Sequence, residues 1–241
     1  ESKAWMIIII IAIVALAAGY YLSSGGFAPL TGKVISEENP LRVGVMIPLS
    51  GDAASYGVSA QRGIEMAKEE LGLDDVELIY EDSKCEGKEA VNSINKLISI
   101  DKVHVIIGEM CSGATLAAAP IAEENKVPMI SPASTSPEIT TAGDYIFRTV
   151  PSDTLQGDFG AQLVYDQGYR KLAVLYSNED YGKGFNDVLL EKFEGEIVAS
   201  EAFERGSVDL RAQLTKIKDS GADAIYIISN SPDSAVAALK Q

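Results

Sequence analysis

Short runs of aliphatic residues alternate with longer amphipathic segments over most of the chain. Runs that are apolar throughout are typical of strands buried on both faces of a parallel sheet. The segments between them predict helices, and two of these, residues 59–72 and 209–221, end in glycine. This alternation predicts an α/β protein with doubly wound parallel sheets. The predicted strands cover residues 41–49, 76–80, 103–108, 127–133, 145–150, 171–177, 196–203 and 222–229.

The first 40 residues have a different pattern. Residues 4–22 contain no charged side chain, and about 20 apolar residues are needed to cross a bilayer as a helix. The segment Ala15–Ala17 has the small residues of a signal-peptide cleavage site, so residues 1–22 predict either a membrane anchor or a cleaved signal. Residues 23–40, rich in Gly, Ser and Pro, predict a flexible linker. Both alternatives place the remainder outside the cytoplasm. The chain begins at Glu1 rather than Met, so we expect further sequence upstream.

The composition limits the chemistry. With 20 basic and 35 acidic residues the formal net charge is −15, which disfavours nucleic-acid binding. The single histidine, His104, lies within a predicted strand, so zinc sites and Cys–His catalysis lack partners. Glycine-rich phosphate-binding motifs are missing as well. We expect no cofactor, no metal and no enzyme activity.

Cys85 and Cys111 are the only cysteines. Cys111 lies where a predicted strand changes into small, polar residues, a position that suits a nucleophile, a metal ligand or a structural thiol. In a cytosolic protein both would be free thiols. Beyond an export segment, an even pair predicts a disulfide.

The loops that follow the first four predicted strands are small and rich in hydroxyl groups. Parallel sheets bind ligands in the crevice beyond the carboxyl ends of their strands. Four such loops in succession therefore predict a polar recognition site at one edge of the sheet. The loops are residues 48–57, 81–87, 109–115 and 131–138.

These loops, in this order, resemble the type I periplasmic binding proteins, and most closely the leucine/isoleucine/valine-binding branch of ABC-transporter receptors. The resemblance is carried by "LSGDAASYG", "EDSKCEGKEAVNSINKLI", "GEMCSGAT", "ISPASTSPEIT", "FRTVPSD" and "DYGKG", which span about 190 residues in all. It implies two α/β lobes that close on a ligand, here lobe 1 at residues 41–150 and lobe 2 at residues 151–241, with a hinge at residues 149–153. Gln241 falls inside a predicted helix, so we expect the chain to lack the end of lobe 2 and the return to lobe 1.

The resemblance also implies an amino-acid site. Ser112 opens a predicted helix, whose first N–H groups favour an anion; by resemblance, Ser112 and Thr135 bind the ligand carboxylate and the Ala133 carbonyl accepts its ammonium group. From the residues alone, the pattern favours Ser112 as a helix N-cap, a role that does not exclude contact with a ligand. The alternative for the segment "SPAST" is a local β-turn.

The side-chain pocket is implied by three further residues. Tyr56 and Tyr181 match the positions from which the two lobes line the ligand's side chain. Asn230 stands where the branch typically has an aromatic residue, which weakens the case for Leu, Ile or Val and admits a more polar ligand. The family's acidic partner for the ammonium group would lie beyond Gln241.

The resemblance therefore implies a solute-binding protein at the cell surface or in the periplasm. It would deliver an amino acid, branched-chain-like, or a related small polar solute to the transmembrane subunits of an ABC permease. One alternative is the extracellular domain of a membrane sensor. A third reading is an extracytoplasmic hydrolase that uses Ser112 or Cys111.

Overall fold

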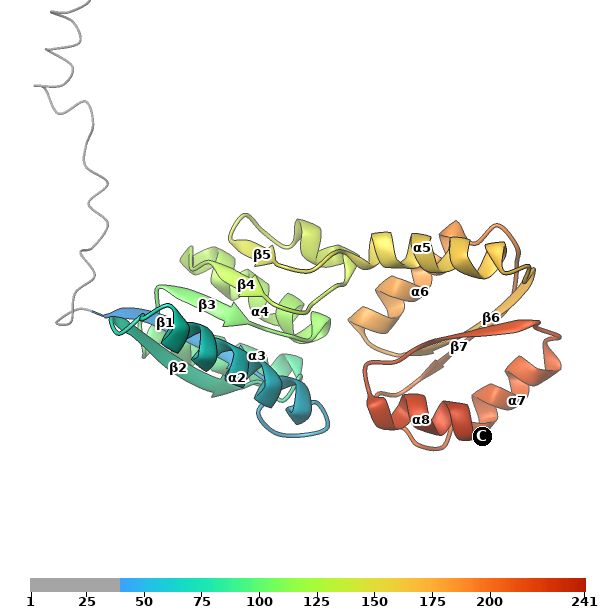
Figure 1. Ribbon diagram of the computed structural model, residues 1–241, viewed down its shortest axis with the longest axis horizontal. Helices are drawn as coiled ribbons and strands as arrows, with labels where there is room; N and C mark the ends of the chain where they lie inside the picture. Colours follow the sequence, from blue (N-terminus) through green and yellow to red (C-terminus); the bar gives the residue numbers. More distant parts are fainter. Residues whose placement is uncertain (1–39) are drawn as a thin grey trace, which may run out of the picture. The chain divides into compact units, whose positions relative to one another are not determined.

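A computed structural model describes residues 40–241 and contains two parallel β-sheets with helices packed on them (Figure 1). The first sheet has the strand order β2-β1-β3-β4-β5 and the second has the order β7-β6-β8. Every strand pair in both sheets is parallel, which confirms the predicted α/β class. The strands are β1 (Leu41–Ile47), β2 (Val76–Asp82), β3 (Val105–Gly108), β4 (Met129–Ser131), β5 (Ile146–Arg148), β6 (Lys171–Ser177), β7 (Glu196–Phe203) and β8 (Ala224–Ile228).

Helices connect consecutive strands, as parallel pairing requires. We call the first sheet with α2, α3, α4 and η1 lobe 1, and the second sheet with α5 to α8 lobe 2. The chain passes from lobe 1 to lobe 2 between β5 and α5, at the predicted hinge; that this segment acts as a hinge stays a prediction. The helices are α2 (Ala54–Glu70), α3 (Gly87–Ser99), α4 (Ser112–Asn125), η1 (Pro137–Thr141), α5 (Asp153–Asp166), α6 (Asp180–Lys192), α7 (Arg211–Asp219) and α8 (Pro232–Lys240).

Each sheet is buried on both faces. In β1, Val43, Val45 and Ile47 belong to one apolar cluster. Met46, which points to the opposite face, belongs to another, together with Ile94 of α3. Two separate clusters likewise cover the two faces of the second sheet. Burial on both faces explains why the strands are apolar throughout instead of alternating apolar and polar residues.

Four strands, β3, β4, β5 and β8, start one or two residues later than the sequence pattern predicts. His104 was expected inside the third strand, but β3 begins at Val105 and His104 is exposed, accepting a hydrogen bond from the Arg42 N–H at Nδ1 (3.0 Å). The predicted membrane segment (residues 1–22) and the linker (23–40, except Pro40) lie outside the described residues. Within residues 40–241, no helix combines the length and the apolar character needed to cross a membrane.

Candidate functional site

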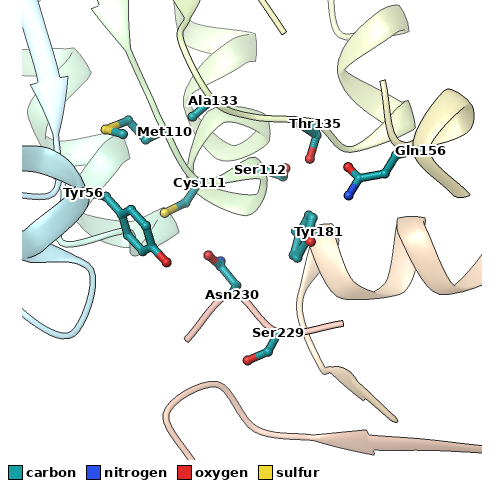
Figure 2. Close-up of a pocket in the computed structure, with 10 residues that line it drawn as sticks. All are labelled: Tyr56, Met110, Cys111, Ser112, Ala133, Thr135, Gln156, Tyr181, Ser229 and Asn230. Carbon is teal, nitrogen blue, oxygen red and sulfur yellow. The ribbon is translucent and has the colours of Figure 1, made fainter. Parts of the chain in front are cut away.

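Loops at the carboxyl ends of strands from both lobes surround a cavity of about 280 Å³ (Figure 2). The contributing segments follow β1, β3, β4, β5, β6 and β8, which is where parallel sheets bind ligands. All six residues predicted to bind a ligand line this cavity. Four further residues were not predicted as ligand contacts: Met110, Cys111, Gln156 and Ser229. The complete lining is Tyr56, Met110, Cys111, Ser112, Ala133, Thr135, Gln156, Tyr181, Ser229 and Asn230.

Ser112 is the first residue of α4 and is almost completely buried. The N-cap residue of α4 is Cys111, so the interpretation of Ser112 as a simple helix cap is wrong. The Ser112 Oγ accepts a hydrogen bond from the Ser136 N–H (3.2 Å). Its own hydroxyl hydrogen can therefore be donated to a ligand. The first turn of a helix also carries N–H groups without intrahelical partners and the positive end of the helix dipole. Together these features can stabilise a carboxylate.

The segment after β4 is both a turn and part of the cavity. The Ser131 Oγ accepts hydrogen bonds from the N–H groups of Ala133 (3.4 Å) and Ser134 (2.9 Å), as in a turn closed by a serine side chain. The Thr135 carbonyl accepts a hydrogen bond from the N–H of Asp153 (2.8 Å). The turn is therefore structural, and it presents Ala133 and Thr135 to the cavity.

Glu109, at the end of β3, is the centre of a buried polar network below the site. Its carboxylate accepts hydrogen bonds from the Ser83 hydroxyl (2.7 Å) and the Cys111 N–H (2.5 Å). Its carbonyl accepts hydrogen bonds from the hydroxyls of Thr115, Ser131 and Ser134. These contacts fix the loops after β2, β3 and β4 relative to one another, so the network holds the donors of the site in position.

Burial raises the pKa of Glu109 to about 7. The hydrogen bonds from Ser83 and from the Cys111 and Met110 N–H groups, and the charge of Arg205, act in the opposite direction but do not compensate for the loss of hydration. No sequence pattern pointed to this role. The only available signal was an acidic residue directly after a buried strand.

Cys85 and Cys111 form a disulfide with a Cα–Cα distance of 5.4 Å, as predicted. The bond joins the loop after β2 to the loop after β3, immediately before Ser112. A disulfide sulfur is neither a free nucleophile nor a thiolate metal ligand, so those two alternatives for Cys111 are wrong. His104 and Ser112 lie at opposite ends of β3, hence the chain's single histidine cannot serve as the base for a Ser112 nucleophile.

The tyrosines approach the cavity from different lobes. Tyr56 lies in the first turn of α2 and is 46% exposed. Tyr181 lies in the first turn of α6 and stacks on Phe185, with ring centroids 6.2 Å apart. Burial raises the pKa of the Tyr181 phenol well above its usual value, and the charge of Asp153 adds to this effect. Asn230 follows β8 and lies with its side chain between the two rings in Figure 2. The structure thus brings together all three residues of the predicted side-chain pocket.

Arg205, in the loop after β7, connects lobe 2 to lobe 1 beside the disulfide. Its guanidinium donates hydrogen bonds to the Cys85 carbonyl (2.9 Å) and to the Glu86 carboxylate (2.6 Å), and it lies 3.4 Å from the Asp52 carboxylate. The side chain is only 16% exposed. These contacts border a second, more polar cavity of about 570 Å³.

Comparison with known proteins agrees with this geometry. The family model described as periplasmic binding protein matches residues 40–241. A leucine-, isoleucine-, valine-, threonine- and alanine-binding protein of Pseudomonas aeruginosa is 31% identical over 205 residues, which are 80% of this chain and 54% of that protein. The chain spans about half the length of the curated relatives it matches.

Solved structures with bound ligands are also similar. The branched-chain amino acid transporter substrate-binding protein of Streptococcus pneumoniae, in complex with isoleucine, is 33% identical with a TM-score of 0.72, covering 78% of this chain and 57% of that one. A solute-binding protein from R. palustris, in complex with 4-hydroxybenzoate, is 26% identical with a TM-score of 0.79, covering 84% and 57%. The similar chains named here are binding proteins.

Proposed function

We propose that this chain, which belongs to the type I periplasmic binding protein family and to its leucine/isoleucine/valine-binding branch, captures a small amino acid between its two lobes. The observation that carries the proposal is the position of Ser112. Its buried hydroxyl is free to donate, it begins a helix, and it faces a cavity between the carboxyl ends of two sheets.

The size and lining of the cavity support a small, partly apolar ligand. A volume of about 280 Å³ lies at the lower limit of about 300–1,000 Å³ for pockets that hold drug-sized molecules. Tyr56 and Tyr181 supply apolar area with few rotatable bonds. Asn230 adds an amide, which accommodates a more polar side chain than those of Leu, Ile or Val.

Both an amino acid and an aromatic acid would satisfy the Ser112 end of the cavity, because both carry a carboxylate. The relative bound to isoleucine and the relative bound to 4-hydroxybenzoate represent these two classes. We favour the amino acid because Ala133 lines the cavity and its carbonyl can accept a hydrogen bond from an ammonium group, which a benzoate lacks.

Membership of the family implies a location outside the cytoplasm. There the protein would pass its ligand to the transmembrane subunits of an ABC permease, and attachment through residues 1–22 would keep it near that permease. Binding would favour a closed arrangement of the lobes about residues 149–153, because only that arrangement lets residues of both lobes contact one ligand.

The proposal is tested on the intact protein. A thermal-shift screen of amino acids and small carboxylates first identifies a ligand, because binding to the folded state raises the melting temperature. Calorimetry then compares the wild type with Ser112→Ala and with the double variant Ser112→Ala/Thr135→Ala. Ser99→Ala, at an exposed position in α3, is the matched control.

We expect Ser112→Ala to weaken binding by about ten- to a hundredfold, since hydrogen bonds to charged groups contribute roughly 1.5–3 kcal/mol. The double variant should bind more weakly still, while Ser99→Ala should bind like the wild type. Unchanged affinity in the double variant would show that the carboxylate does not bind here.

A further inference from the structure

The first half of α6, in lobe 2, lies against lobe 1. Its neighbours there are α4 and η1, and α4 and α6 can be followed in Figure 1. Both helices begin at the ligand cavity, α4 with Ser112 and α6 with Tyr181 in its first turn. The contact itself, which we call the seam, uses other residues, none of which lines that cavity. They are Gly113, Ser136 and Pro137 of lobe 1 and Asp180 and Gly184 of lobe 2.

Two glycines lie where the seam is tight. A Cβ atom on Gly113 would lie 2.6 Å from the Asp180 Oδ2. A Cβ atom on Gly184 would lie 3.0 Å from the Pro137 Cδ and 3.2 Å from the Ser136 Oγ. Non-bonded heavy atoms prefer separations of about 3.5–4.0 Å. A side chain at either position would therefore push the two lobes apart.

The local backbone does not require glycine at these two positions. Gly113 and Gly184 lie inside helices, and neither has a positive φ. Glycine within a helix is less favourable than alanine, so each glycine weakens its own helix. Its missing side chain is explained by the approach of the other lobe. Gly63 of α2 differs in this respect, because no atom lies within 4 Å of the place of its Cβ.

Attraction across this side of the molecule comes from other groups. Arg205 of lobe 2 donates hydrogen bonds to the Cys85 carbonyl and to the Glu86 carboxylate of lobe 1. It lines the second cavity together with Gly113 and Asp180. The glycines add no such attraction; they leave the space that lets the attracting groups meet.

We propose that Gly113 and Gly184 set how far the two lobes can close, and that they determine ligand affinity through this closure and not through contact with the ligand. The inference rests on the proposed function, since it concerns capture of a ligand between the lobes. The apparent dissociation constant is the intrinsic constant divided by the fraction of protein that can adopt the binding arrangement. A substitution that acts only on closure changes this fraction and therefore weakens every ligand by the same factor.

The test adds one methyl group at each position, in Gly113→Ala and in Gly184→Ala. Gly63→Ala, at an exposed position inside a helix with open space around it, is the matched control. Calorimetry on the intact protein measures the affinity for L-leucine and for L-threonine, one apolar and one polar probe. Urea denaturation of the ligand-free protein measures the stability of each variant.

We expect Gly184→Ala to weaken the binding of both probes by about tenfold, because the proline ring that it meets is rigid and added methyl groups are costly in packed regions. Gly113→Ala should weaken both by about threefold or more, since the Asp180 side chain must leave its preferred rotamer. Within each variant the factors for the two probes should agree to within about twofold. Gly63→Ala should bind both probes like the wild type.

Stability separates closure from ordinary packing. Alanine favours a helix over glycine, and in the ligand-free protein the lobes can move apart and avoid the new methyl group. None of the three variants should therefore be less stable in urea than the wild type. A glycine variant of the seam that is less stable or does not fold would show that the residue is needed within its own lobe, which would overturn the proposal. Wild-type affinity in both variants, or clearly different factors for the two probes, would also overturn it.

A double-mutant cycle identifies the atom that Gly113 avoids. Asp180→Ala removes the carboxylate that a Cβ at position 113 would meet. Adding Gly113→Ala to that variant should change the affinity by less than about twofold, because the two residues are coupled through this contact. An equal loss of affinity with and without the Asp180 side chain would contradict the contact at the seam.

The two proposals fail in different ways. If Ser112→Ala weakens both probes while the variants at Gly113 and Gly184 bind like the wild type, the closure role is wrong and the proposed site stands. If Ser112→Ala changes nothing while the two glycine variants weaken both probes equally, the carboxylate site is wrong and the closure role stands. A wild type that binds neither probe would contradict the proposed function and this inference with it.

Discussion

The buried carboxylate of Glu109 gives the free energy of unfolding a specific dependence on pH. Its pKa is about 7 in the folded protein against a usual value of 4.5. Between these values the folded protein holds a proton that the unfolded chain has released, so stability falls as the pH rises from about 4.5 to 7. This difference in pKa corresponds to about 3 kcal/mol of the free energy of unfolding. The contribution is present below about pH 4.5 and is lost above about pH 7.

Glu109→Gln removes this dependence while keeping the shape. The glutamine oxygen can accept the hydrogen bond from the Cys111 N–H, and its NH₂ group can donate to the Ser83 hydroxyl, which rotates to accept it. Below pH 4.5 the variant and the wild type should be similarly stable. At pH 8 the variant should be more stable by about 3 kcal/mol, since it has no charge to bury.

Urea denaturation of the ligand-free protein at several pH values between about 4 and 8 measures this difference. Glu124→Gln, at an exposed position of α4, is the matched control and should follow the wild-type curve. The other carboxylates of this acidic chain contribute equally to the pH dependence of both proteins, so their contributions cancel in the difference between variant and wild type. Parallel curves for Glu109→Gln and the wild type would refute the assignment of a raised pKa to this residue.

Two further predictions concern the contacts beside the site. The double variant Cys85→Ala/Cys111→Ala should lower the free energy of unfolding by roughly 3.5 kcal/mol, the chain-entropy value for a sequence separation of 26; a loss in urea denaturation below about 1 kcal/mol would contradict it. Arg205→Gln should weaken ligand binding by about fivefold, equivalent to about 1 kcal/mol for a partly shielded ion pair, because it removes contacts that favour the closed arrangement. Calorimetry at low and high salt checks this, since only the wild type should lose that advantage as salt is added.

The fold could be predicted because its strands are buried on both faces. β6 (Lys171–Ser177) and β7 (Glu196–Phe203) have the predicted bounds. β6 is a continuous apolar run with a polar residue at each end, whereas β7 also contains Ser200 and Glu201. β3 is two residues shorter than predicted. His104 is next to an apolar run in the sequence, but the strand begins only after it, at Val105. Hydrophobic pattern locates the centre of a strand better than its ends.

The site could be predicted in part for a related reason. Parallel strands bring the loops at their carboxyl ends together, so the loops that contain Ser112 and Thr135 could be assigned to one edge from the strand pattern. The choice of these two residues within the loops came from the family resemblance. The direction of a side chain in the first helix of lobe 2 could not be predicted from the sequence. Gln156 lies in the first turn of α5, and its contact with the cavity depends on how α5 is placed against lobe 1.

Buried charges were the least predictable part. Glu109 and Asp153 are ordinary acidic residues in the sequence. Neighbours that shape their surroundings lie 26 residues away along the chain: Ser83 beside Glu109, and Glu179 near Asp153. A period of 2 or 3.6 residues reports which face of an element is apolar, but it does not reveal a single polar group that tertiary contacts bury. Such groups gather at functional sites because binding and catalysis use charges with perturbed pKa values.

The two lobes hold their parts of the site by different means, and this determines what each perturbation reports. On the lobe 1 side, Ser112 is fixed by the adjacent disulfide, by the hydrogen bond from Ser136 and by the Glu109 network. On the lobe 2 side, Tyr181 is held mainly by packing on Phe185. Loss of one lobe 1 contact leaves two others, so changes there should alter stability more than affinity. The lobe 2 residues reach the ligand only when the lobes are closed, hence changes at Arg205 should alter affinity more than stability.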